Sequence, residues 1–177
     1  MRLGPLVRRR WPFGVAAVVA LAAVVGVWFQ PQKLWIDDRV SEPLPVAAEA
    51  SPGTTAPGGT GAVASSDVAG GRFVSREHHT EGAVRVIAHG DGRHTVRLEG
   101  LDTSNGPDLR VYLSANRADG PEGGFDDDYV SLGRLKGNQG DQNYDVPDGV
   151  DLSRLSTVVI WCDRFNAVFG AADLTPA

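Results

Sequence analysis

Short runs in which apolar and polar residues alternate dominate the chain from about residue 73 onward. In the run "TVRLEGL", Val96 and Leu98 share one face while Arg97 and Glu99 share the other. This period of two is typical of a strand with one buried face, and no window shows a sustained helical period of 3.6. We therefore expect an all-β domain, an antiparallel β-sandwich of seven or eight strands. The expected strands lie near residues 83–88, 95–101, 109–114, 129–135, 142–146, 156–162 and 166–174.

Turn residues separate these runs. Asp91-Gly92 stands between the first two expected strands and is the strongest hairpin signal in the chain. The run "TVVIW" at 157–161 is apolar on both faces, which predicts an interior strand covered on both sides. About a hundred residues arranged in this way can enclose one core without disulfides.

The N-terminal segment differs in character from the rest of the chain. Residues 11–29 carry no charge and follow a cluster of arginines within residues 1–10. As a helix they would span about 28 Å, close to the thickness of a bilayer core. We predict a single transmembrane helix at 11–29, with residues 1–10 cytoplasmic and the remainder outside the plasma membrane.

Two other interpretations of this segment remain. A cleaved signal peptide would require a small-residue cleavage site directly after the apolar run, where the sequence reads "VWFQPQ". A buried core helix does not account for the flanking arginines. We favour the membrane anchor over both.

Residues 30–70 join the predicted anchor to the predicted domain at 71–177. Residues 30–40 suggest a juxtamembrane collar, and the rest is mostly Pro, Gly, Ala, Ser and Thr. A segment of this composition buries too little apolar area to offset its loss of conformational entropy. We expect a disordered, flexible stalk.

The charge of the chain is unevenly distributed. Residues 1–71 hold six Lys and Arg against five Asp and Glu, a net of +1, whereas residues 72–177 hold eleven against seventeen, a net of −6. An acidic domain has no electrostatic attraction to nucleic acid. A basic protein partner or a cation fits this charge better.

Cys162 is the single cysteine of the 177 residues and ends the expected interior strand. By alternation it shares a face with Val158 and Ile160, while Asp163 and Arg164 directly after it indicate that the chain reaches solvent there. One sulfur cannot form a dithiol–disulfide couple within the chain. Cys162 is therefore either a small buried core residue or a group that reacts with a partner, a cofactor or an oxidant.

Histidines and aspartates offer weaker signals. His78 and His79 are adjacent, and His89 and His94 flank the expected hairpin turn. Two imidazoles plus a carboxylate can hold a transition metal, but no metal-binding spacing is present, and we assign no metal ligands from the sequence. The acidic run 126–128 lies in a glycine-rich loop and is either a calcium site or a solvated loop.

Four stretches carry a resemblance to a known family. They are "FVSREHHTEGAVRVI", "NGPDLRVYLS", "VSLGRLKGNQGDQNYDVP" and "VVIWCDRFNAVFGAADL". In order and spacing they resemble the DM-thirteen family, small extracytoplasmic β-domains related to the DOMON sandwiches that bind haem or sugars. The resemblance implies an electron-transfer role, with Cys162 as the redox residue and His79 as the family's histidine before a glycine, a candidate cofactor ligand.

Two functions follow as hypotheses. The first is a membrane-tethered extracytoplasmic domain that takes part in redox or electron-transfer chemistry through Cys162, at most as an electron-transfer component and not as an enzyme. Its partner would be a redox or cell-envelope protein. The sequence does not determine the cofactor, for which haem and a transition metal are the two candidates. The alternative is a non-catalytic binding or cell-envelope interaction module in which Cys162 only fills the core.

Overall fold

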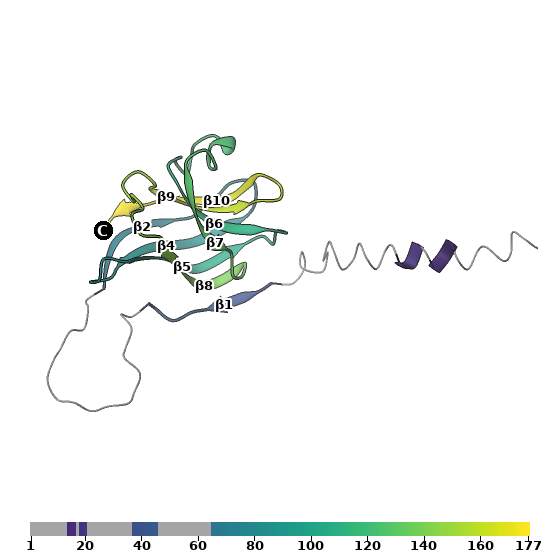
Figure 1. Cartoon of the computed structure of the whole chain (residues 1–177), viewed down its shortest axis with the longest axis horizontal. Helices are drawn as coiled ribbons and strands as arrows, with labels where there is room; N and C mark the ends of the chain where they lie inside the picture. The colour runs from purple at the N-terminus through teal and green to yellow at the C-terminus, as the bar shows by residue number, and fades with distance from the viewer. Residues whose placement is uncertain (1–13, 17, 21–36, 46–64) are drawn as a thin grey trace, which may run out of the picture. The chain divides into compact units, whose positions relative to one another are not determined.

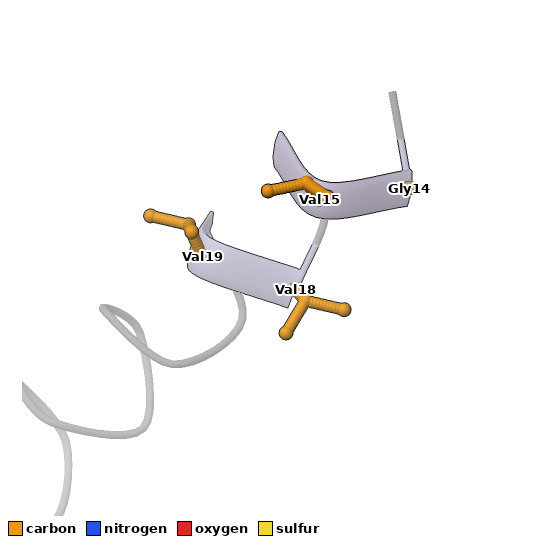
Figure 2. A pocket seen from close by; sticks show the side chains of 4 residues that line it. All are labelled: Gly14, Val15, Val18 and Val19. Atoms are coloured by element: carbon orange, nitrogen blue, oxygen red, sulfur yellow. The ribbon is translucent and has the colours of Figure 1, made fainter. Parts of the chain in front are cut away.

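The computed structural model describes residues 14–16, 18–20, 37–45 and 65–177 (Figure 1). Residues 14–16 and 18–20 are helical, and the side chains of Val15, Val18 and Val19 are more than half exposed around an open apolar pocket (Figure 2). No helix in the described part of the chain is long and apolar enough to cross a membrane. Most of the predicted anchor at 11–29, and all of residues 1–10, lie outside the described residues.

Two sheets form the domain, which is all-β as the alternation predicts. The six-stranded sheet has the order β1 (Arg39–Ser41), β8 (Gln139–Val146), β5 (His94–Thr103), β4 (Thr80–Ala88), β2 (Ser66–Arg72) and β11 (Thr175–Pro176). The five-stranded sheet has the order β3 (Val74–Ser75), β10 (Ala167–Asp173), β9 (Thr157–Cys162), β6 (Leu109–Ser114) and β7 (Tyr129–Arg134). All strand pairs are antiparallel except β1 with β8, which is parallel.

The main core contains the inward side chains of both sheets, which is the arrangement of a β-sandwich. Val96 and Leu98 of β5 are fully buried there, as their alternation predicts. The expected hairpin is also confirmed, because β4 and β5 pair around the Asp91-Gly92 turn and Gly92 takes a φ of 88°. A second, smaller core lies on the other side of the five-stranded sheet and contains Tyr112, Ala118, Phe125, Val159, Trp161, Val168 and Ala171.

The structure has strands in parts of the region 30–70, where the sequence predicts a juxtamembrane collar at 30–40 and a flexible stalk after it. Residues 39–41 form β1 on the edge of the first sheet, and residues 66–72 form β2 between β4 and β11. Small residues permit this close packing, because a side chain at Gly71 would collide with the backbone oxygen of Asp173. The domain therefore includes residues 37–45 and 65–70, and residues 46–64 lie outside the described part.

Glu42 fixes the segment that follows β1. Its carboxylate accepts hydrogen bonds from Lys136 Nζ at 2.7 and 2.9 Å and from the backbone N–H of Asn143 at 2.7 Å. Burial raises the pKa of Glu42, but the hydrogen bonds from Lys136 and Asn143 outweigh it, and the net pKa is below its ordinary value. The charged carboxylate is thus the form that holds this segment against β8.

We expect Glu42→Gln to lower the free energy of unfolding by about 1 kcal/mol at pH 7. Because the folded-state pKa is lowered, the stabilisation is present above the unfolded-state pKa and is lost as the pH falls through the folded value. Urea denaturation at pH 7 and at pH 3 should therefore show a difference between variant and parent that shrinks in acid. Glu122→Gln, at an exposed position, is the control. A difference that is equal at both pH values would contradict the assignment.

Candidate functional site

Cys162 is the last residue of β9, and its side chain is fully buried. It belongs to the main core together with Val158 and Ile160, as alternation predicts. Its neighbours across the sheet are Leu109 of β6 and Ala167 of β10, which belong to the same core. The sulfur is thus surrounded by apolar side chains between the two sheets.

The chain reaches solvent directly after Cys162, as the following charges predict, but the sulfur does not. Residues 163–166 form an exposed turn, in which the N–H of Phe165 donates to the Cys162 carbonyl oxygen at 3.3 Å. The side chain of Phe165 is 64% exposed and points away from the core, and Asn166 takes a positive φ of 53° to complete the turn. The boundary between core and solvent therefore lies one residue beyond the thiol.

A polar network covers the surface next to this turn. The Tyr112 hydroxyl donates to Asp163 Oδ1 at 3.0 Å. The other oxygen, Oδ2, lies 3.2 Å from Arg110 Nε, close enough for an ion pair although Nε has no hydrogen bond of good geometry. Asp108 lies between Arg110 and Arg134, at 3.5 and 3.2 Å. These charges fix the loops outside the core and do not reach the thiol.

Aromatic side chains close the opposite face of β9. Trp161 is 1% exposed and lies 6.2 Å, between ring centroids, from Tyr112, which in turn stacks on Tyr129 at 4.3 Å. Burial, and secondarily the hydrogen bond to Asp163, raises the pKa of Tyr112 well above its ordinary value. Both faces of the strand that carries Cys162 are therefore closed.

His79 lies elsewhere, directly before β4, and it is exposed. The structure brings it to Glu81 and Asp102, and the ligand atoms of these three residues all lie within 4.8 Å of one another. Sequence reasoning did not find this group. Residues 79 and 81 do have the spacing of one strand face, but Asp102 enters only through the register of β4 on β5.

The other three histidines do not belong to this group of ligands. His78 packs on Phe169, with ring centroids 4.0 Å apart. His89 is buried, and its Nε2 is 2.9 Å from Thr95 Oγ1. His94 lies opposite Ala88. Within the described part of the chain, the group that could hold a metal includes neither His89 nor His94.

The acidic run 126–128 lies in the loop between β6 and β7. Asp128 forms an ion pair with Arg154, so one of the three carboxylates already has a protein partner. The same loop is fixed by the Arg76 guanidinium, which donates to the carbonyl oxygens of Ala118 and Gly120 at 3.0 and 2.8 Å. Protein groups order this loop, and the calcium interpretation gains no support from it.

A family model described as "Electron transfer DM13" matches residues 72–174, more than half of the chain. No curated protein matches this sequence. No solved structure matches it either.

Proposed function

Because this chain belongs to the electron-transfer DM13 family, we propose that its β-sandwich is an electron-transfer module that works with a bound group or a protein partner, and that Cys162 is not the group that exchanges electrons. The module is not an enzyme in its own right. In this proposal the basic and apolar residues at 1–29 hold the domain outside the plasma membrane. The partner is another redox or cell-envelope protein.

The family match supports the electron-transfer role, and the burial of Cys162 is the observation that argues against its thiol as the redox group. Thiol exchange and oxidation begin with a thiolate that a reagent can reach. Within an apolar core a thiolate loses its hydration, and no reagent can approach the sulfur without opening of the sandwich. Ligation of haem by Cys162 would require the same opening, so a cofactor is better placed on the surface of the domain.

A thiol-accessibility experiment tests this directly. A chromogenic disulfide reagent should react with Cys162 of the folded full-length chain, in mild detergent, at least about a thousandfold more slowly than with the chain in urea. Exposure of the sulfur requires opening of a core whose stability is about 5 kcal/mol or more. A native rate close to that of the unfolded chain would restore Cys162 as a redox residue and overturn this part of the proposal.

Redox titration with small mediators distinguishes a redox centre at Cys162 from one at a bound group. We expect the full-length chain and Cys162→Ala to give the same signal once any bound group is present, provided that circular dichroism shows both to be folded. Loss of the signal in the folded variant would assign the redox centre to Cys162.

A non-catalytic interaction module is the second candidate, and the same burial favours it, since a sealed thiol is a common core residue. In that case neither protein would show a redox signal with any metal or with haem. The interaction with the cell envelope would then survive Cys162→Ala.

A further inference from the structure

Three potential metal ligands meet where β4 begins and β5 ends. We propose that His79, Glu81 and Asp102 bind a divalent transition-metal ion on the exposed face of the six-stranded sheet. His79 and Glu81 are exposed and Asp102 is half-buried, so an ion could enter from solvent. The binding itself does not depend on the proposed electron-transfer role, whereas any redox use of the ion rests on it.

The backbone places these side chains before any ion arrives. Glu81 and Asp102 are register partners on neighbouring antiparallel strands, and a β-bulge at Gly82, with a φ of 127°, follows directly. Such partners have Cβ atoms about 5 Å apart on one face of the sheet, and bulges commonly redirect side chains at sites. The strands thus place both side chains next to each other on the same face of the sheet.

Buried neighbours fix the same strand ends from the inner side. Thr80 and Thr103 are 1% and 2% exposed, and their hydroxyl oxygens lie 2.7 Å apart in a hydrogen bond. The carbonyl oxygen of His79 accepts a hydrogen bond from the N–H of Ser104 at 3.2 Å. The residues that flank the three ligands are therefore anchored, and only the ligand side chains themselves are free to turn.

The charges on this face distinguish the group from its surroundings. Like charges directly opposite one another on two strands are destabilising. Elsewhere on the sheet Glu99 is paired with Arg85 and Arg97 at 2.9 Å. Among the described residues no Lys or Arg is paired with Glu81 or Asp102, and the amide of Gln139, 3.4 Å from Asp102 Oδ1, carries no charge. A bound cation would neutralise this pair.

The ligand set indicates the class of ion. Imidazole nitrogen suits Zn²⁺, Cu²⁺ and Fe²⁺ and is not a ligand that Mg²⁺ or Ca²⁺ prefers. Ligands about 2.1 Å from a tetrahedral ion are about 3.4 Å apart, so the present separations of up to 4.8 Å close by modest rotation of exposed side chains. Three protein ligands leave open positions for water or for a group from a partner. A redox-active ion here would be accessible to a partner, which Cys162 is not.

Titration calorimetry of the untagged full-length chain with Zn²⁺ tests the site. We expect one ion per chain, and at least tenfold weaker binding in each of His79→Ala, Glu81→Gln and Asp102→Asn. The matched controls Glu77→Gln and His94→Ala should bind as the parent does. Dissociation constants above about 1 mM for the parent, or unchanged binding in all three ligand variants, would overturn the proposal.

Copper separates this inference from the proposed function. Electron paramagnetic resonance of the Cu²⁺-loaded chain should show nitrogen coupling that His79→Ala abolishes. If that coupling is present but the bound copper does not cycle with redox mediators, the metal site stands and its electron-transfer role fails. If Cu²⁺ binds without the His79-dependent coupling, the ligand assignment is wrong even where the chain proves redox-active.

Discussion

Arg97→Ala is expected to lower the free energy of unfolding by about 3 kcal/mol, because it removes the central cation of the buried polar network on β5. The Arg97 side chain is 5% exposed. Its guanidinium donates to Glu99 Oε1, Asp141 Oδ2, Asn143 Oδ1 and the backbone oxygens of Glu42 and Pro43, at 2.9–3.2 Å. Both carboxylates reach water in part, which keeps the loss near the lower end of the range for broken buried ion pairs.

Arg85→Ala is the matched control for this prediction. Arg85 lies opposite Arg97 on the neighbouring strand and pairs with Asp67 and Glu99, but its side chain is 35% exposed. We expect a loss below about 1 kcal/mol there. Urea denaturation of both variants gives the comparison. Equal losses would show that the segment after β1 does not bury Arg97 in solution.

The alternation of β5 predicts the side on which Arg97 lies but not its burial. Arg97 is on the face away from the main core, as the pattern requires. It is buried because the chain after β1 covers it with the carbonyl oxygens of Glu42 and Pro43, more than fifty residues earlier in the sequence. The alternation within β5 cannot predict a contact with a segment so far away in the sequence.

Elements with strong local signals were predicted correctly. The strand at 157–162 is buried at every position, as a run apolar on both faces requires, and the hairpin at Asp91-Gly92 forms where its turn residues stand. β1 and β2 were missed for two different reasons. Three residues with one apolar side chain, Val40, give no period, and the small residues of 66–72 look like linker because composition does not reveal that Gly71 lies against β10.

The candidate site was likewise predicted only in part. The sequence predicts which face of β9 carries Cys162, but the burial of the sulfur depends on the pairing of β9 with β6 and β10 and on the packing of the two sheets. His79 and Glu81 are two positions apart on one segment, whereas Asp102 joins them through pairing across a bulge. Because strand pairing brings these three residues together, they form no metal-binding spacing motif in the sequence.

Phe125→Ala is expected to destabilise the protein more than Arg97→Ala does. We expect the free energy of unfolding to fall by about 3–5 kcal/mol, because the substitution removes a fully buried ring. Phe125 holds the loop between β6 and β7 over Trp161 in the second core, with the Arg76 guanidinium 5.8 Å from its ring centroid. The hydrogen bond from the N–H of Ala118 to Asp173 fixes the other end of the loop at 2.7 Å. Without the ring these polar contacts must hold the loop alone.

Phe165→Ala supplies the control, since it is the same substitution at a ring that is 64% exposed. We expect a change within about 0.5 kcal/mol there. Urea denaturation gives the stability, and Trp fluorescence should shift to the red only in Phe125→Ala, since water then reaches the outer face of β9. The Cys162 thiol should stay unreactive in the folded population of both variants, because it faces the main core between the sheets. A thiol that becomes reactive in Phe165→Ala alone would show that the exposed turn, and not the sandwich core, protects the sulfur.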